Sequence, residues 1–499
     1  MSTLYHSTRS NDATVTSTQA IIAGIAPDGG LYVSDALGET QLDLTRVCGQ
    51  SWRATCNDVL NTLVGDLSAE TIARCVDEAY ASFTSDAVTP VSAIGNDWLL
   101  ELYHGPTCAF KDVALQMLPR LMTASLAHEA AASGSAPQRI MILTATSGDT
   151  GKAALAGFAD VEGIGCTVFF PAGGVSDVQR LQMVTQPGAN VAVAGIHGNF
   201  DDAQTTVKRI SGDRALAERL AEHGMALSSA NSINVGRLVP QVVYYFDAYA
   251  QLVRSGAISC GDEVDFCVPT GNFGDVLAGY YAKQLGLPVH QFVVASNTND
   301  VLTEFLTTGR YNRVRPFEKT ISPSMDILVS SNLERLLYYA SGRDCELVAQ
   351  LMRSLDETGE YQVPAELFAE ISGLFRCGSA NDDETRSAIA RAWQTDGRLI
   401  DPHTAVGKHV LDTREGTGHA RVLLSTASPY KFSPAVLEAL GESTEGLSGF
   451  DCMDRLEALT NTQAPAPLAA LREAPVRFRD EIEREAMPAY VEDACKRLL

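Results

Sequence analysis

Short apolar runs separated by stretches with helical spacing dominate the chain from about residue 139 onward. Five of these runs are continuous and rich in β-branched residues, which is typical of strands buried on both faces of a parallel sheet. They are Arg139 to Thr144, Gly165 to Phe170, Asn190 to Ile196, Glu263 to Val268 and Val289 to Ala295. Helical stretches lie between them, including an Ala-rich one around Thr150 to Ala159. The pattern predicts an α/β fold with a parallel sheet covered by helices.

The pattern changes on either side of this region. Near the N-terminus a helical stretch covers about residues 51–83 and follows a Pro-Asp-Gly-Gly turn at Pro27 to Gly30, while strand character returns late, at Arg421 to Ser425. The chain is therefore predicted to have four parts: a smaller N-terminal domain over residues 1–95, an α/β core over 96–320 with a subdomain at roughly 135–230, a mostly helical lobe over 321–400, and a C-terminal segment over 401–499 that rejoins the core.

Charge and cysteine content narrow the class of protein. The 499 residues include 38 Lys and Arg against 61 Asp and Glu, a formal charge of −23, so we expect no nucleic-acid or membrane partner. The eleven cysteines show neither a C-x-x-C pair nor zinc-type spacing, which favours reduced thiols and no bound metal. The polar first ten residues lack a signal-peptide core, and no stretch approaches the roughly 18 apolar residues of a membrane span. A cytoplasmic protein is predicted.

Four loops carry small, polar or glycine residues where the chain is expected to leave a strand, and ligands bind at that edge of open α/β sheets. The first, Thr144 to Lys152 (TATSGDTGK), differs from a nucleotide-binding P-loop because Thr146 and Ala153 replace the required glycine and hydroxyl residue. Its hydroxyl groups and amides suit a carboxylate or a phosphate. A plain helix N-cap at Ser147 or Asp149 would explain it equally.

The other three loops also have two interpretations each. Pro269 to Asp275 (PTGNFGD) is either a phosphate cradle at a helix start or a simple turn. In His104 to Gln116, Lys111 stands among apolar residues and is either a snorkelling surface lysine or a buried amine able to form a Schiff base. In Ser228 to Gln241, Arg237 follows a hydroxyl-rich helix start and either binds a phosphate monoester or lies in solvent.

Taken together, the loops favour one chemistry. A Schiff-base lysine, a phosphate cradle and a second anion site on one sheet edge suit pyridoxal phosphate (PLP) with a phosphorylated or carboxylated amino acid.

Longer segments then resemble the threonine synthase family, in the longer-chain type found in fungi and many bacteria. The matching segments run in the same order over nearly the whole chain: Ser7 to Arg9, Ala26 to Val33 (APDGGLYV), the HGPTCAFKDVALQ loop with Lys111, Ser147 to Lys152 (SGDTGK), Ile196 to Asp202 (IHGNFDD), Asn231 to Asn234 (NSIN), Gly271 to Asp275 (GNFGD), Ser322 to Leu337 (SPSMDILVSSNLERLL), Asp401 to Gly407 (DPHTAVG) and Leu424 to Phe432 (LSTASPYKF).

The resemblance implies a fold-type II PLP enzyme, similar in architecture to the tryptophan synthase β-subunit. Such an enzyme is a carbon–oxygen lyase acting on phosphates, and it converts O-phospho-L-homoserine and water into L-threonine and phosphate, the last step of threonine biosynthesis. The family pattern implies these roles: Lys111 as the Schiff-base lysine and catalytic residue; Gly271, Asn272, Phe273, Gly274 and Asp275 on the cofactor-phosphate loop; Thr426 at the pyridine nitrogen; Asn231, Ser232 and Arg237 at the substrate phosphate; and Ser147, Gly148, Asp149 and Thr150 at the substrate carboxylate.

The chain departs from the family pattern at a few positions. Ser10 replaces the usual glycine after Ser-Thr-Arg, and Val235, Gly236 and Pro240 differ from a commoner version of the NSIN helix. Pro240 is expected to kink this helix or mark its first turn.

Two alternatives stay open. One is another fold-type II reaction, such as that of threonine dehydratase or cysteine synthase. The other is a non-synthesising homologue that binds a phospho-ligand, or a phospholyase. The NSIN loop with Arg237 favours the synthase, because dehydratase substrates carry no distal phosphate. We expect a small-molecule substrate and a monomer or homodimer.

Overall fold

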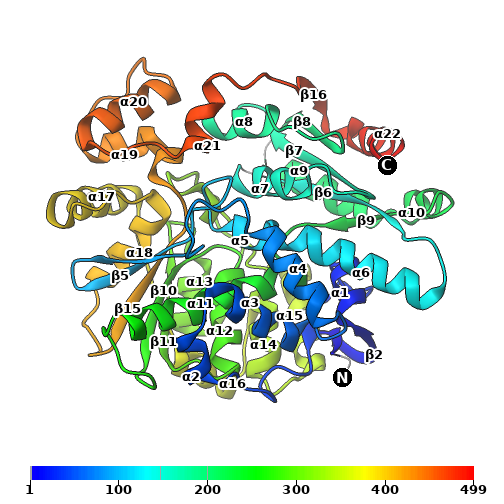
Figure 1. Cartoon of the computed structure of the whole chain (residues 1–499), viewed down its shortest axis with the longest axis horizontal. Coiled ribbons are helices and arrows are strands. Elements are labelled where there is room, and N and C mark those ends of the chain that lie inside the picture. Colours follow the sequence, from blue (N-terminus) through cyan, green and yellow to red (C-terminus); the bar gives the residue numbers. More distant parts are fainter. Residues whose placement is uncertain (1–2, 147, 199) are drawn as a thin grey trace.

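The computed structural model describes residues 3–146, 148–198 and 200–499, and the described chain is built around two main sheets (Figure 1). The larger sheet has six strands in the order β14-β11-β10-β15-β5-β4, all parallel except β4, which is antiparallel to β5. Its strands are β4 (Val91–Ile94), β5 (Asp97–Glu101), β10 (Val264–Pro269), β11 (Val289–Ser296), β14 (Phe375–Ser379) and β15 (Ala420–Ser425).

The smaller sheet has five parallel strands in the order β16-β8-β7-β6-β9 and occupies the upper part of Figure 1. Its strands are β6 (Arg139–Ala145), β7 (Ile164–Pro171), β8 (Val191–His197), β9 (Met225–Ser229) and β16 (Asp480–Glu483). The predicted α/β class is confirmed, and every strand predicted from a continuous apolar run is present. These strands divide between two sheets, because the chain leaves the smaller sheet after β9 and enters the larger one at β10.

Twenty-two α-helices of the described chain pack on and around the sheets. They are α1 (Ser17–Ala23), α2 (Leu44–Gly49), α3 (Trp52–Leu63), α4 (Ala69–Ala79), α5 (Lys111–Leu115), α6 (Met117–Ser133), α7 (Asp149–Phe158), α8 (Asp177–Val184), α9 (Phe200–Ser211), α10 (Arg214–Ala221), α11 (Val235–Arg254), α12 (Gly274–Gln284), α13 (Val301–Thr308), α14 (Leu333–Ala340), α15 (Cys345–Thr358), α16 (Ala365–Leu374), α17 (Asp382–Asp396), α18 (Pro402–Asp412), α19 (Ser433–Ala439), α20 (Gly449–Thr460), α21 (Ala466–Ala469) and α22 (Met487–Leu498).

Both faces of the larger sheet are buried, which explains its continuous apolar sequences. In β10, Phe266 and Val268 belong to the core that contains α11 and α12, whereas Cys267 between them faces the core that contains α18. This alternation is the two-residue period of a strand, with apolar side chains on both sides. Helix α11 is buried along almost its whole length and packs against α2, α3, α5 and α12.

The structure adds detail to three expectations about elements. The stretch 51–83 forms two helices, α3 and α4, because Ser68 caps the second one through its side chain after a turn. The segment predicted as mostly helical also supplies β14, which pairs with β11 at the edge of the larger sheet. Helix α11 begins at Val235 and continues through Pro240 to Arg254, so Pro240 does not mark its first turn. The four-part division of the chain stays a prediction.

Two small sheets complete the described fold. One is an antiparallel sheet in the order β2-β1-β3, near the N-terminus, and the other pairs β12 with β13. Their strands are β1 (Leu4–Ser7), β2 (Ser10–Thr16), β3 (Tyr32–Ser34), β12 (Arg310–Asn312) and β13 (Glu360–Gln362). Among the described helices, none has the length and apolar character needed to cross a membrane.

Candidate active site

A pocket opens where strands of both sheets end at their carboxyl termini, as expected for an α/β fold. It is lined by residues that follow β6, β10 and β15, by the start of α5 and by the start of α11. Of the residues expected at the site, these line it: Lys111, Asp149, Thr150, Asn231, Ser232, Arg237, Gly271, Asn272, Gly274, Asp275 and Thr426. Ser147 lies outside the described residues, while Gly148 and Phe273 are near the pocket without lining it.

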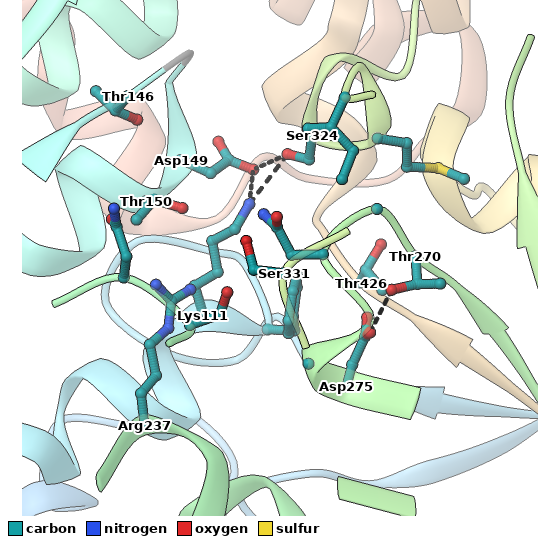
Figure 2. Close-up of a pocket in the computed structure, with 18 of the residues that line it drawn as sticks. Lys111, Thr146, Asp149, Thr150, Arg237, Thr270, Asp275, Ser324, Ser331 and Thr426 are labelled. Carbon is teal, nitrogen blue, oxygen red and sulfur yellow. Dashed lines mark hydrogen bonds and ion pairs between the residues drawn. The ribbon is translucent and has the colours of Figure 1, made fainter. Parts of the chain in front are cut away.

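Lys111 is the first residue of α5, and its side chain is buried, so the surface interpretation of this lysine is wrong. Its Nζ donates to Ser324 Oγ at 3.0 Å and lies 4.0 Å from Asp149 Oδ2 (Figure 2). The pKa of Lys111 is lowered to about 8. Burial is the main cause, Asp149 opposes the shift, and Arg237 adds to it. A useful fraction of the amine is therefore unprotonated near neutral pH, as a nucleophile requires.

Asp149 is the first residue of α7, and both of its carboxylate oxygens are engaged by protein groups. Oδ1 is 2.8 Å from Lys431 Nζ and accepts from Gln179 Nε2 at 3.0 Å, while Ser324 Oγ donates to Oδ2 at 3.5 Å. Burial alone would raise the pKa of Asp149, but the ammonium groups of Lys431 and Lys111 outweigh it and hold this pKa well below its ordinary value. Asp149 is an anion at neutral pH.

The expected cofactor-phosphate loop joins β10 to α12. Its carbonyl oxygens are held by a neighbouring segment: Ser330 Oγ donates to the Gly271 carbonyl at 2.7 Å, and the Asn332 amide nitrogen donates to the Asn272 carbonyl at 3.1 Å. A Cβ on Gly271 would approach the Ser324 carbonyl to 3.1 Å, so the loop passes close to the opposite wall. At the start of α12 the Val276 amide donates to the Asp275 carboxylate, whereas the amides of Gly274 and Asp275 have no carbonyl partner of the helical pattern and suit an anion.

The side chains of Phe273 and Asp275 help to hold the backbone of this loop in place. Phe273 has a φ of 61°, an uncommon conformation for a non-glycine residue, and its buried ring packs against Phe375. Asp275 accepts from Thr270 Oγ1 at 2.5 Å and from the Val276 amide at 3.0 Å. Burial raises the pKa of Asp275 to about 6, against the effect of the Thr270 hydrogen bond. The two side chains fix the loop backbone.

Thr426 follows β15 and faces the pocket from the larger sheet. Its backbone is held on both sides, because its amide donates to Thr404 Oγ1 at 3.2 Å and its carbonyl accepts from the Phe110 amide at 2.8 Å. Its buried hydroxyl finds no hydrogen-bond partner within the described part of the chain. A buried polar atom without a partner is costly unless a ligand satisfies it, so the hydroxyl fits a ring nitrogen that needs a hydrogen bond.

Arg237 is the third residue of α11 and is buried beneath the pocket (Figure 2). Its Nη1 donates to the Ala230 carbonyl at 2.8 Å, whereas its Nε is buried with no acceptor in residues 3–146, 148–198 and 200–499. Burial lowers its pKa to about 10, with Asp275 opposing, so it stays a cation at neutral pH. Asn234 caps α11 through the Gly236 amide and so serves the helix. The arrangement offers an anion a buried, directed donor.

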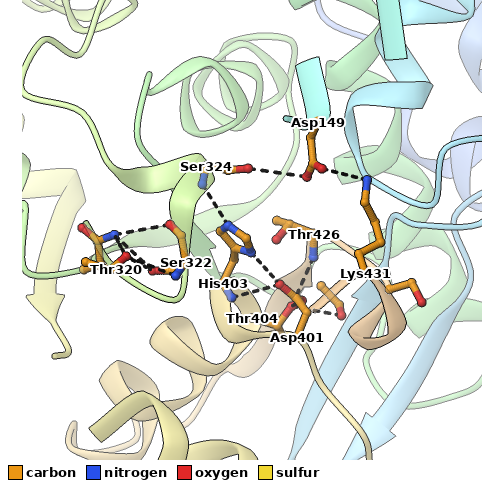
Figure 3. A network of polar contacts seen from close by, with 12 residues as sticks. Asp149, Thr320, Ser322, Ser324, Asp401, His403, Thr404, Thr426 and Lys431 are labelled. Atoms are coloured by element: carbon orange, nitrogen blue, oxygen red, sulfur yellow. Dashed lines mark hydrogen bonds and ion pairs between the residues drawn. The ribbon is translucent and has the colours of Figure 1, made fainter. Parts of the chain in front are cut away.

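Several pocket residues had no role assigned from the sequence. Ser324 contacts Lys111 directly, and its amide donates to His403 Nε2 at 3.1 Å. Since Nε2 accepts, His403 carries its proton on Nδ1, which is 2.8 Å from Asp401 Oδ1 (Figure 3). Ser324 and His403 belong to segments quoted for the family resemblance, but nothing in their sequence pattern indicates contact with Lys111. Lys208 and Gln204 of α9 also line the pocket.

The described side chains offer no group of three His, Cys, Asp or Glu that could hold a metal ion. The pocket instead combines a buried amine, a loop with free amides, an unpaired hydroxyl and a buried arginine, and these fit an aldehyde cofactor that carries a phosphate and a ring nitrogen.

Residues 93–425 match the family of pyridoxal-phosphate-dependent enzymes, and the protein is an enzyme of this class. The ends match the threonine synthase N terminus over residues 4–80 and the threonine synthase C-terminal family over residues 404–491. The chain belongs to the threonine synthase family.

Relatives and solved structures agree with this assignment. Threonine synthase of Pseudomonas aeruginosa is 40% identical over 439 residues, which cover 87% of this chain and 90% of that protein. The crystal structure of PLP-bound threonine synthase from Brucella melitensis has a TM-score of 0.87 at 37% identity and covers 99% of this chain and 100% of its own. Human threonine synthase-like 1 is also 40% identical over 439 residues, which cover 85% of this chain but only 58% of that longer protein. The fold-type II architecture expected from the sequence is confirmed.

Proposed function

We propose that this enzyme converts O-phospho-L-homoserine and water into L-threonine and inorganic phosphate, the last step of threonine biosynthesis. One observation carries the proposal: the pocket that contains the buried amine of Lys111 also contains a buried arginine, Arg237, whose Nε has no acceptor among the described residues. The amine suits the aldehyde of the cofactor, and the arginine suits a phosphate monoester on the substrate.

Bound PLP supplies an electron sink for charge that develops on the substrate carbons. In our proposal Lys111 would hold its aldehyde, and the Thr426 hydroxyl would bond its ring nitrogen. The loop from Gly271 to Asp275 would hold its phosphate through amides other than that of Phe273, which donates to Thr270 Oγ1 at 3.2 Å. A hydroxyl leaves that nitrogen less protonated than a carboxylate would, which tempers the sink and disfavours transamination.

Lys111 has a second task once the substrate amine has displaced it. Its free Nζ removes the proton from the substrate Cα and returns it later, as a general base and then a general acid. Asp149, 4.0 Å away, stabilises the ammonium form while the proton is held. A second proton is removed from Cβ, the Cγ–O bond breaks as the phosphate leaves, and Cγ takes up a proton to become the methyl group of threonine. Water then adds at Cβ, and the proton that it releases is taken up by the phosphate.

The two ends of the substrate need different partners. We assign its phosphate to Arg237, Asn231 and Ser232, because departure of phosphate requires its charge to be neutralised. We assign its carboxylate to the start of α7, through the backbone amides of Asp149 and Thr150 and the Thr150 hydroxyl, since the Gly148 amide already donates to Thr146 Oγ1 at 2.9 Å. The Asp149 side chain keeps its bonds to Lys431 and Gln179 and orients that helix start.

A coupled phosphate-release assay with O-phospho-L-homoserine, followed by identification of the amino-acid product, tests the proposal. Threonine and phosphate in equal amounts are expected. Phosphate without threonine would indicate a phospholyase, and no phosphate release would indicate a non-synthesising homologue. Conversion of threonine itself to a keto acid would indicate a dehydratase.

We further propose a cytoplasmic enzyme that is a monomer or a homodimer. All eleven cysteines are free thiols, which supports a reducing compartment. Thiol titration of the denatured protein after isolation under non-reducing conditions should count eleven, and light scattering measures the oligomeric state.

A further inference from the structure

Lys431 belongs to the 3₁₀ turn Pro429–Phe432 that follows β15, and its side chain is completely buried, with an exposed fraction of 0%. It is not among the pocket-lining residues, so it does not meet a ligand there. Its Nζ is 2.8 Å from the Asp149 Oδ1 atom (Figure 3). Nζ also donates to the Thr107 carbonyl oxygen at 3.0 Å, and these are its two partners among the described residues.

The two partners of Lys431 belong to two segments that both connect to Lys111. Thr107 is in the loop that leads into α5, and its amide and hydroxyl bind Asp112, the neighbour of Lys111, at 2.8 and 2.6 Å. Asp149 begins α7, and its second oxygen, Oδ2, faces Lys111 Nζ at 4.0 Å. A single buried ammonium thus joins the loop before the reactive lysine to the carboxylate beside it.

A buried carboxylate needs a partner charge, because burial strongly disfavours an isolated anion. Without Lys431, the Asp149 carboxylate would have Lys111 as its nearest cation and would pair fully with it, so Lys111 would be held as an ammonium ion. With Lys431 present, its ammonium group already balances the charge of Asp149 at the Oδ1 atom.

We propose that Lys431 is a positioning residue for the reaction at Lys111: its ammonium group fixes Asp149 beside the reactive nitrogen, ties it to the Thr107 loop that binds the neighbouring Asp112, and supplies the counter-charge that leaves Lys111 free to lose its proton. This inference rests on the proposed function of Lys111 as the cofactor-binding base.

The charges around the site support the sign of this effect. The groups that act on Lys111 come from four segments, and burial together with Arg237 and Lys431 lowers its pKa while Asp149 and Asp275 raise it. The charge of Lys431 also acts to lower the pKa values of Asp112, Cys108 and Lys152. Removing Lys431 therefore takes away one positive charge near Lys111 and leaves the negative charge of Asp149.

The experiment uses the holoenzyme and the variant Lys431→Met, which keeps the chain length and loses the charge. The visible absorption band of the bound cofactor is titrated with pH, because it reports protonation of the nitrogen of Lys111. We expect the midpoint to rise by about 1 pH unit, at the lower end of the shifts that a nearby charge produces. Below the midpoint this leaves about tenfold less of the unprotonated form.

Lys408→Met is the matched control. Lys408 is also a buried lysine with carboxylate partners, Asp412 and Asp97, but it lies outside the pocket lining. Its loss should lower thermal stability without moving the midpoint. An unchanged midpoint in Lys431→Met, or an equal shift in Lys408→Met, overturns the inference.

The double variant Asp149→Asn/Lys431→Met keeps the test decisive if Lys431→Met folds poorly. Because it removes both charges of the pair, it should melt at a higher temperature than Lys431→Met and have a midpoint nearer that of the parent. A double variant that matches Lys431→Met in both measurements refutes the assignment. If the parent itself neither binds PLP nor makes threonine, the proposed function fails, which is a separate outcome.

Discussion

Replacing Arg237 by Met removes a buried guanidinium and keeps most of its aliphatic stem. One nitrogen of the guanidinium, Nη1, is held by the Ala230 carbonyl at 2.8 Å, which orients the group, while Nε is left for a ligand. Since the group is buried and cationic at neutral pH, its bond to a phosphate is charge-assisted and protected from water. The variant should therefore be impaired mainly with phosphohomoserine and should still bind the cofactor at Lys111, while loss of this cation raises the pKa of Lys111.

The size of the effect follows from that geometry. Losing one preorganised, charge-assisted donor to a group that gains charge in the reaction costs about 2 to 4 kcal/mol. At 1.36 kcal/mol for each factor of ten, kcat/KM for phosphohomoserine should fall roughly 30- to 1000-fold. Binding of L-threonine, which carries no phosphate, should change less than about threefold.

Steady-state phosphate release measures kcat/KM for phosphohomoserine, and the change in cofactor absorbance on adding L-threonine measures threonine binding. Arg120→Met is a matched control, because Arg120 is half-buried on α6, binds only backbone carbonyls through Nη1, and lies outside the pocket lining. If Arg237→Met keeps kcat/KM within threefold of the parent, or weakens threonine binding as much as phosphohomoserine turnover, the reasoning is refuted.

Three more variants test other parts of the pocket. Lys111→Ala should show no visible imine band, no borohydride trapping of PLP and no turnover; normal threonine formation would exclude Lys111 as the base. Thr426→Val should leave the melting temperature of the cofactor-free protein unchanged, because the hydroxyl has no protein partner in the described structure, and should weaken PLP retention about 2- to 10-fold, measured by dialysis. Asp275 has a raised pKa of about 6, so between about pH 4 and 6 the folded state keeps a proton that the unfolded state has lost, and its contribution to stability falls as pH rises through this window. In denaturant titrations Asp275→Asn should remove up to about 3 kcal/mol of that fall; equal pH slopes in the two proteins would count against it.

The elements that the sequence predicted correctly are those whose residues carry a local signal. Strands such as β6 and β10 are buried on both faces, so their apolar runs are continuous. By contrast, β14 (Phe375–Ser379) has only one apolar residue with high strand propensity, and its conformation depends on pairing with β11. The charged β16 likewise is a strand because it pairs with β8 at the edge of its sheet.

In the pocket too, the sequence predicts only those residues that carry a local signal. Lys111, Arg237 and the glycine loop were found because each belongs to a loop whose local composition suggests anion or aldehyde chemistry. Ser324 contacts Lys111 across 213 residues of sequence, and Lys431 reaches Thr107 across 324. No local pattern marks such partners, because their role comes from burial and from distances that only the folded chain fixes.

The position of strand β15 in the larger sheet affects how the chain folds while it is being translated. It lies between β10 and β5, although it is the last of the six strands to be translated. The middle of this sheet therefore stays incomplete on the ribosome until about residue 425 has emerged. Nascent chains that lack this strand would expose the apolar edges of β10 and β5, so synthesis of this enzyme should depend on protection by chaperones until β15 has emerged.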